Sequence, residues 1–541
     1  MSEPAEGESK SLKSVAIIAT VVGTSFLNSF FSGALTSSLP TIGRDLQYSA
    51  AALTWPVSLN ALMLGAFLLP FGRVADIAGH RIVFLGGTAW FALGSLAVAL
   101  APDNQGFSAL CALLGLGAAA NMPAGVGILG SHFSAGPTKN KAFASLGAGQ
   151  PLGYIAGLVI GAVFTTTKTG WRASFYVQAA LSALFLVLGY FTIPPPSPRS
   201  RRHSLTEITV PPEDADAQST HTLFLDLADN KKIDYVGAIL SVSGLVLLTF
   251  ALADASSEPK GWKTPWLPPL VPIAVLILAA FFYWESVLSK RLAAFYSAPK
   301  DQRSKSPPPP PLLTPSIWKA PHLGEILIVV FFAWASFNTS TYYINLLLQL
   351  VMDVSPLKTA LFFLPMIISG TVLNFVPGFT LGHVNGKAFV VASMLLSFIS
   401  PILLATVDTS ASYWAYIFPM MLTSPATDLI FSVATVQISR SVSRSEQATA
   451  GALFNVTTRL ATSISLAVIS SIANVVSTQY LGSHPFDASL KAQTADSPDV
   501  LIAGYRLAAW LCVGCVGVST VVAVVGLRGI GVVGKKETKA E

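Results

Sequence analysis

Residues 82–101, IVFLGGTAWFALGSLAVALA, form a run of twenty residues without a single charge. A helix needs about 20 mainly apolar residues to cross the hydrocarbon core of a bilayer, so this run has the length and composition of one membrane span. It does not alternate between polar and apolar residues, as a strand of a transmembrane barrel would. Because backbone N–H and C=O groups must be paired internally in lipid, the run is predicted to be an α-helix.

Similar runs recur along the whole chain. Of the 541 residues 52% are hydrophobic and 11% are charged, against about 25% charged residues in a typical soluble domain. The sequence therefore predicts an all-α polytopic membrane protein with fourteen spans. They are expected at residues 15–37, 50–71, 82–101, 107–131, 143–164, 173–193, 235–253, 267–287, 323–343, 359–376, 388–406, 412–436, 449–473 and 501–527.

The basic residues give these spans a direction. If the N-terminus is cytoplasmic, 24 of the 33 Lys and Arg residues lie in cytoplasmic segments and seven lie in external connectors. This bias follows the positive-inside rule and predicts that both termini are cytoplasmic. The net charge of +6 is scattered over connectors and forms no basic stripe, so no nucleic-acid partner is expected.

The connectors divide the chain into seven parts. We expect a cytoplasmic leader (1–14), a six-helix bundle (15–193), a linker (194–234), two inserted helices (235–287), a Pro-rich linker (288–322), a second six-helix bundle (323–527) and a cytoplasmic tail (528–541). Proline runs favour extended chain without a packed core, so both linkers are predicted to be disordered. The segment Arg201-Arg202-His203-Ser204 fits either a phosphorylation site or contact with anionic lipid headgroups.

The connector after the second span is the most specific local motif. Residues 72–81, GRVADIAGHR, place glycines at Gly72 and Gly79, where they allow a tight reversal at the membrane surface. The Asp76 carboxylate is placed to bind backbone N–H groups at a helix start. Arg73 and Arg81 are expected to hold this gating loop on the cytoplasmic side.

A weak internal repeat accompanies this motif. Residues 70–81, PFGRVADIAGHR, align at an offset of 307 with residues 377–388, PGFTLGHVNGKA. The repeat pairs spans 1–6 with spans 9–14 and leaves spans 7 and 8 as an insertion. Parallel halves of this kind are a transporter architecture.

The loop resembles the G-x-x-x-D-x-x-G-[RH]-[RK] motif between the second and third helices of the major facilitator superfamily. Gly153, Gly157 and Gly161 are similar to the antiporter motif of its fourteen-span drug:proton antiporter branch, although close helix packing alone would also explain them. Further matches to this branch are Leu39-Pro40-x-Ile42-x-x-Asp45-Leu46, Trp171-Arg172 and Asp234-Tyr235-x-Gly237.

Within the branch, Asp428-x-x-Phe431 followed by Gln447-x-x-Ala450-Gly451 looks most like the fungal aminotriazole-resistance group, which includes borate-efflux and low-affinity ammonium transporters. The resemblance implies a major-facilitator fold of two six-helix bundles plus two inserted helices. It also implies efflux by proton antiport, a plasma membrane more than a vacuolar location, and a monomer.

Departures from the family pattern weaken the case for proton coupling. The span-four motif R-x-x-Q-G-x-G is replaced by Cys111-Ala-Leu-Leu-Gly-Leu-Gly, and Leu158 and Ala162 replace a proline and a glycine of the antiporter motif. Asn28 stands where an acid is often found. The N-terminal half therefore lacks a titratable group deep in the membrane.

Two charged residues are placed inside spans of the C-terminal half, where charges are costly and are candidates for function. We hypothesise that Asp428 and Arg459 face a central cavity, with Asp428 exchanging a proton or binding a cationic solute. The alternative is a structural ion pair or capped contact between spans 12 and 13. Candidate cavity-lining residues are Asn28, Trp55, Asn60, Asn121, Gln150, Tyr154, Asn338, Tyr342, Gln349, Asn374 and Asn455, each of which could instead form an interhelical hydrogen bond.

Together these features predict a secondary transporter that moves a small solute by alternating access, most simply by proton-coupled efflux. The alternatives are a facilitator or uptake carrier for a neutral or cationic solute, such as ammonium, and a transporter-like receptor or sensor. No Ser/His/Asp, metal-ligand or phosphate-loop arrangement supports an enzyme, and no cofactor or metal is expected. The three cysteines, Cys111, Cys512 and Cys515, lie within spans and have no partners for a metal site.

Overall fold

The computed structural model describes residues 3–49, 52–133, 137–195, 230, 232–257, 263–298, 306–380, 384–441, 447–484, 494–495 and 497–527. The Arg201 to Ser204 segment lies outside these residues. The first six helices are α1 (Glu3–Asp45), α2 (Trp55–Ala78), α3 (His80–Ala99), α4 (Asn104–His132), α5 (Pro137–Thr165) and α6 (Arg172–Thr192). The inserted helices are α9 (Tyr235–Ser257) and α10 (Leu267–Ser297).

The C-terminal part contains α11 (Leu323–Leu346), α12 (Pro356–Phe362), α13 (Leu364–Thr380), α14 (Gly386–Ser397), α15 (Ile399–Ala405), α16 (Ile417–Thr423), α17 (Ala426–Ser441), α18 (Gln447–Ser483) and α19 (Pro498–Gly526). Short turns of 3-10 helix occupy Ala52–Thr54 and Pro315–Lys319, and α11 continues as a π-helical turn at Leu347–Val351.

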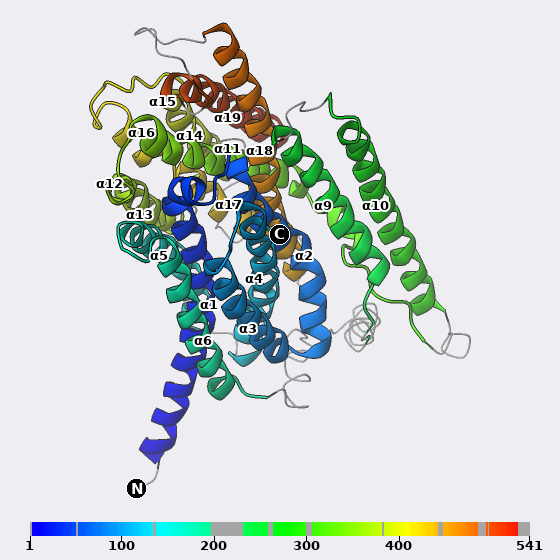
Figure 1. The fold of residues 1–541 in the computed structure, drawn as a ribbon. Helices are drawn as coiled ribbons and strands as arrows, with labels where there is room; N and C mark the ends of the chain where they lie inside the picture. The colour runs from blue at the N-terminus through cyan, green and yellow to red at the C-terminus, as the bar shows by residue number, and fades with distance from the viewer. Residues whose placement is uncertain are drawn as a thin grey trace.

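Helices α1 to α6 pack as one bundle (Figure 1). α1 packs along α5, α2 along α4, and α3 between α4 and α6. We call the end of the molecule at which α1 begins the near face, and the end at which α1 finishes, around Asp45, the far face. The direction of each later helix follows from its order in the chain.

Helices α11 to α19 form the second bundle, in which α11 packs against α18 and α19. The inserted helices α9 and α10 pack on each other and stand at one side of the molecule (Figure 1). α9 touches both bundles, because it contacts α2 of the first and α18 of the second. The inserted pair therefore spans the boundary between the halves.

The expected span at 412–436 is not one continuous helix. Among the described residues, thirteen helical stretches are long and apolar enough to cross a membrane, and this segment is not one of them. It consists of α16 and α17, separated at Ser424 and Pro425. A proline has no N–H to donate and its ring clashes with the preceding turn, so the break falls at Pro425.

The Pro-rich linker differs from its prediction. α10 runs ten residues beyond the expected end of its span, to Ser297, and the segment from Ser306 to the start of α11 is also described. Leu312, Leu313 and Ile317 of this segment are buried, with exposed fractions of 8%, 4% and 0%. The end of the linker therefore packs against the helices, because this contact buries its few apolar side chains. Most of the first linker, 196–229, lies outside the described residues.

Candidate functional site

The two bundles are joined by hydrogen bonds toward the far face. Asn345 of α11 donates its side-chain Nδ2 to the carbonyl of Thr36 in α1, at 2.7 Å. One turn later Gln349 donates its Nε2 to the carbonyl of Ser37, at 3.1 Å, and to Asn345 Oδ1, at 2.9 Å. We call Asn345 and Gln349 the amide latch, since both bind backbone carbonyls of the opposite bundle.

A second contact between the halves joins α2 to α18. The Ser463 hydroxyl donates to the carbonyl of Ser58, at 2.8 Å, again in the far half of the molecule. Nearer the middle, a Cβ added at Gly65 would lie 3.0 Å from Cβ of Arg459. Among the described residues, every hydrogen bond recorded between the bundles lies toward the far face.

Arg459 therefore lies at the interface of the two bundles, about a third of the way along α18. Its side chain is half-buried, and its Nε atom is buried without a recorded hydrogen-bond partner. A guanidinium N–H in that state is costly unless water or a ligand satisfies it. This is the position that a residue contacting a solute between the halves would occupy.

Asp428 lies in the first turn of α17, immediately after the helix break. Its side chain is half-buried, and its Oδ2 is 3.5 Å from the position of a Cβ at Gly370 in α13. The N-terminal end of a helix favours a negative charge, so the break at Pro425 gives this carboxylate a stabilising position within the membrane. The structure records no ion pair within 4.0 Å between Asp428 and Arg459.

Four of the expected cavity-lining amides form hydrogen bonds within their own bundle. Asn60 donates to the carbonyl of Cys111, at 3.0 Å, and Asn121 accepts from the Thr88 hydroxyl, at 3.3 Å. Asn338 and Asn455 each donate to a carbonyl four residues earlier in their own helix, at 2.9 Å. The contacts of Asn60 and Asn121 are interhelical hydrogen bonds, the alternative to a cavity role, whereas those of Asn338 and Asn455 stay within one helix.

The other expected cavity residues fall into different environments. Trp55 packs edge-on against Phe250 of the inserted helix α9, with ring centroids 5.8 Å apart. Asn28 lies in α1 and Tyr342 lies in α11. The Asn28 Oδ1 atom and the Tyr342 hydroxyl are buried without a recorded hydrogen-bond partner. Gln150 and Tyr154 are half-buried in α5, and the side chain of Asn374 lies outside the described residues.

The gating loop is a single-residue junction between α2 and α3. Gly79 has φ of 102°, a backbone conformation that side chains rarely adopt, and its N–H donates to Ala75 O at 3.0 Å. Arg81 donates to the carbonyl of Tyr190 in α6, at 2.7 Å, and its guanidinium lies over that ring. Arg73 donates to the carbonyl of Asn230, just ahead of α9.

The remaining two residues of the gating loop are Asp76 and Gly72. The Asp76 carboxylate is largely exposed and lies 3.7 Å from Nε2 of His80, one turn later. A Cβ added at Gly72 would meet Pro123 at an ordinary distance, 3.7 Å. The arginines thus bind two different parts of the chain, α6 and the start of the inserted pair.

The glycines of the antiporter-like motif lie on the face of α5 that packs against α1. A Cβ at Gly153 or Gly157 would run into the backbone carbonyl of Phe26 or Phe30, and one at Gly161 would lie 2.9 Å from Cα of Ala34. The four-residue spacing puts all three on one face of the helix. Because these residues have no side chains, the backbones of α1 and α5 can approach each other closely.

A contact that the sequence did not predict joins two of the family-like motifs. Asp45 at the end of α1 accepts hydrogen bonds from Trp171 Nε1 and Arg172 Nη1, each at 2.9 Å. Arg172 also donates to the carbonyl of Ala101, at 3.2 Å. Trp171, Arg172 and Asp45 each belonged to a motif, but pairing them requires knowing that α6 begins on the face at which α1 ends.

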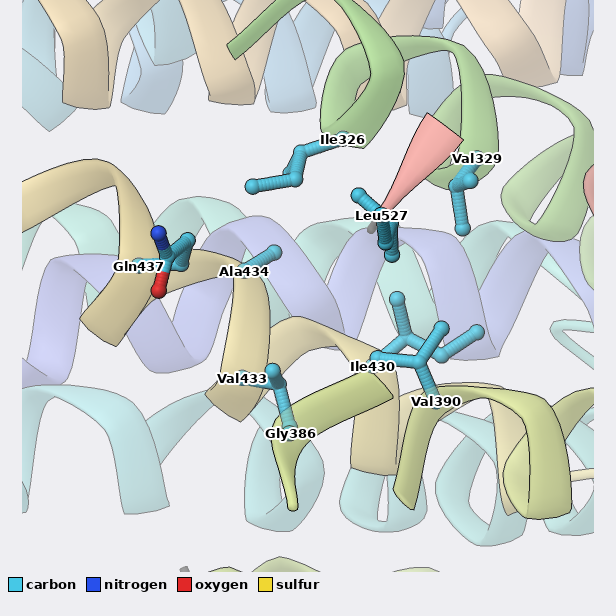
Figure 2. A pocket seen from close by; sticks show the side chains of 9 residues that line it. All are labelled: Ile326, Val329, Gly386, Val390, Ile430, Val433, Ala434, Gln437 and Leu527. Atoms are coloured by element: carbon cyan, nitrogen blue, oxygen red, sulfur yellow. The ribbon is translucent and has the colours of Figure 1, made fainter. Parts of the chain in front are cut away.

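A narrow apolar pocket lies within the second bundle (Figure 2). It is enclosed by α11, α14, α17 and the residue that follows α19, and Gln437 is the one polar side chain among the nine residues that line it. Neither Asp428 nor Arg459 lines it. Its place within one bundle separates it from the interface at which the two halves meet.

Comparison with known proteins agrees with this architecture. The chain is 31% identical to MFS-type transporter 1 of Pyricularia oryzae over 98% of its length and 86% of that protein. It is 28% identical to the low affinity ammonium transporter of Saccharomyces cerevisiae, over 79% of this chain and 75% of that one. It is 25% identical to efflux pump terJ of Aspergillus terreus, over 92% and 85%.

Solved structures share the fold. A bacterial homologue of the human lysosomal transporter Spinster, in an inward-facing and unoccupied conformation, superposes with a TM-score of 0.61 at 13% identity, covering 98% of this chain and 99% of that one. The POT family transporter PepTSo gives a TM-score of 0.61 at 14% identity, over 94% of this chain and 97% of that one. The sequence profile of the Major Facilitator Superfamily matches residues 21–466, and the chain therefore belongs to that superfamily of membrane transporters.

Proposed function

We propose that this transporter moves a small solute out of the cytoplasm by alternating access and that proton antiport through Asp428 drives the movement. That the chain is a multi-pass membrane transporter, not an enzyme, follows from its family and its helices. What we propose is the transport mechanism, the direction of transport and the coupling ion.

One observation supports alternating access: within the described residues, the recorded hydrogen bonds between the two bundles all lie toward one end of the molecule. The amide latch and the Ser463–Ser58 bond hold the halves together in the far half of the molecule. With the cytoplasmic N-terminus that the positive-inside rule predicts, the far face is the external side, and the structure is then closed to the outside. Opening that side requires the two bundles to rock apart and break these bonds.

Two features support a coupling role for Asp428. It is the acidic residue of the broken α16–α17 span, and discontinuous helices frequently form ion and substrate sites near the middle of the membrane. A carboxylate there can carry one proton and release it when its surroundings change between the two open states. Efflux pumps among the relatives, such as terJ, favour the outward direction.

Flux into proteoliposomes with an imposed pH gradient tests this proposal, with borate, ammonium, azoles and weak organic acids as candidate solutes. In the wild-type protein the flux should depend on the gradient. In Asp428→Asn, an isosteric change that cannot release a proton, counterflow exchange should persist while gradient-driven flux is lost. Gradient dependence that survives in a folded, inserted Asp428→Asn protein would contradict the proposal.

Asp408→Asn is the matched control. Asp408 lies in the connector after α15, where the Ser410 hydroxyl and backbone N–H donate to its carboxylate at 2.7 and 2.9 Å. These bonds lower the pKa of Asp408 below its usual range, so the group remains charged in the mildly acidic buffers of such an experiment. Its replacement should leave the pH dependence of flux unchanged.

A carrier without proton coupling is the second candidate. It is favoured by Asn28, which stands where an acid is often found and keeps an unpartnered Oδ1, and by the ammonium transporter among the relatives. This alternative predicts ammonium uptake that follows the solute gradient and is indifferent to an imposed pH gradient. The same proteoliposome measurement separates the two candidates.

A further inference from the structure

Two acidic side chains are buried together at the near-face end of the inserted helices, away from the interface between the bundles. Asp234, the residue before α9, is 2% exposed, and Glu285 of α10 is 1% exposed. On α10, Glu285 belongs to the buried stripe that includes Phe281 and Leu288. A charged residue at such a position requires partners, because burying an unpaired charge is costly.

The two carboxyl groups have unequal surroundings. Asp234 Oδ1 accepts from the N–H of Gly237, at 3.0 Å, and from Trp284 Nε1, at 2.9 Å. Asp234 also occupies the N-terminal end of α9, which favours a negative charge. Glu285 Oε2 accepts from the N–H of Leu313, at 3.0 Å, whereas its Oε1 has no recorded hydrogen-bond partner.

The free oxygen of Glu285 faces Asp234. Asp234 Oδ2 and Glu285 Oε1 lie 2.1 and 2.6 Å from the point that a Cβ at Gly237 would occupy, so the two oxygens are at most about 4.7 Å apart. The missing side chain of Gly237 leaves the space in which the two oxygens meet. Like charges this close in a buried site repel strongly, which favours a proton on one of the two carboxyl groups.

Among the described residues, no basic side chain forms an ion pair with Asp234 or Glu285. The Lys232 ammonium donates to the carbonyl of Pro307, at 2.7 Å, and Arg73 donates to the carbonyls of Asn230 and Lys232. Segment 306–314 carries no charged residue, and on α10 the nearest basic residue, Lys290, lies beyond the next turn. Within the part of the chain that the structure describes, the pair therefore has no ion-pair partner to balance its charge.

We propose that Asp234 and Glu285 form a proton-binding site in which Glu285 holds the proton and donates it to the Asp234 carboxylate. The site clamps segment 306–314, which we call the clamp segment, against the inserted helices through the Glu285–Leu313 bond. Loss of the proton would place two buried anions side by side and release the clamp segment. This site lies outside the transport interface, and its occupancy follows the pH at the near face.

The clamp also reaches the gating loop. Asn230 donates its Nδ2 to the carbonyl of Pro308 in the clamp segment, at 2.7 Å, and accepts from Arg73 with its own carbonyl. A chain of contacts thus runs from the acid pair through the clamp segment and Asn230 to the end of α2. Release of the clamp segment would remove one anchor of the loop between α2 and α3.

Infrared spectroscopy of the full-length reconstituted protein detects the proposed proton directly, as the carbonyl stretch of a buried protonated carboxylic acid. At neutral pH the wild-type protein should show this band, and Glu285→Gln should remove it. Asp428→Asn should leave the band that Glu285→Gln removes, so the test is independent of proton coupling at Asp428. A spectrum unchanged by Glu285→Gln would overturn the proposal.

Hydrogen exchange at the clamp segment tests the clamp. Glu285→Gln keeps an acceptor for Leu313 and a donor for Asp234, so the Leu313 amide should exchange at the wild-type rate. Glu285→Ala removes both, and exchange should accelerate on the order of tenfold to a hundredfold, as expected for one lost buried hydrogen bond. Equal exchange in Glu285→Gln and Glu285→Ala would show that the hydrogen bonds of the side chain at position 285 do not hold the clamp segment. That result would overturn the clamp.

Discussion

At the scale of single residues, the molecule depends on positions where a side chain is missing as much as on those where one is present. Gly79 accommodates a positive φ that lets α2 turn directly into α3, and Gly237 leaves room for two carboxyl groups. Gly157 lets the backbone of α5 contact that of α1. Each glycine has a specific steric reason that can be tested by adding one methyl group.

Gly157→Ala should destabilise the protein by about 1–3 kcal/mol, because its new Cβ would overlap the backbone of Phe30, which cannot rotate away. The thermal unfolding midpoint in detergent measures the effect. Gly147→Ala is the control on the same helix, since nothing lies within 4 Å of the added Cβ. That change should be neutral or stabilising by up to about 1 kcal/mol, given the higher helix propensity of alanine. Equal midpoints for both variants would contradict a packing role for Gly157.

At the scale of elements, the two bundles differ in the continuity of their helices. The helices α1 to α6 each run without a break, whereas three spans of the second bundle are divided, into α12 and α13, α14 and α15, and α16 and α17. Pro425 explains the break that places Asp428 at a helix start. The ends of the continuous helices are held instead by side chains, as at Asp45.

The Asp45–Arg172 pair should connect α1 to α6 with a small coupling energy. Both side chains are partly exposed, at 51% and 33%, so a double-mutant cycle of Asp45→Ala and Arg172→Ala should give about 0.2–1 kcal/mol. Asp45→Ala alone should cost more than this coupling, because it also removes the acceptor of Trp171. Thermal unfolding of the four proteins provides the cycle. Strict additivity of the two single changes would show that the ion pair contributes nothing.

At the scale of the whole molecule, the contacts between the bundles support the proposed rocking motion. The bundles are joined toward the far face by hydrogen bonds of side chains to backbone carbonyls, which are weak enough individually to be broken in a transport cycle. The inserted pair touches both bundles through α9. A transporter that rocks must open where this structure is closed.

A disulfide across the closed end should stop transport. In a variant lacking Cys111, Cys512 and Cys515, the double substitution Ser58→Cys and Ser463→Cys puts one thiol on each of the two residues that the bond from the Ser463 hydroxyl to the Ser58 carbonyl now joins. Oxidation should abolish flux and reduction should restore it, because alternating access requires α2 and α18 to separate. The single-cysteine variants should be insensitive to both treatments. Full flux in the cross-linked protein would exclude opening at this end.

The sequence by itself determined the class of the molecule. Apolar runs such as residues 82–101 must be helical in lipid, and the motif around Asp76, with its spacing of glycine and arginine, identified the family that the comparisons confirm. Such features are local: they depend on neighbours along the chain, so they can be recognised without knowing the fold. The cytoplasmic placement of the termini stays a prediction.

Only the tertiary structure decided which polar residues meet. Asn60 and Asn121 bond within the first bundle, while Asn345, which no motif distinguished, bonds across to the other. The pairing of Asp234 with Glu285, 51 positions later, likewise depends on how α9 and α10 pack. A polar residue in a membrane helix must find a partner, but the sequence does not say on which neighbouring helix. That choice is made by helix packing, which brings together residues far apart in the chain.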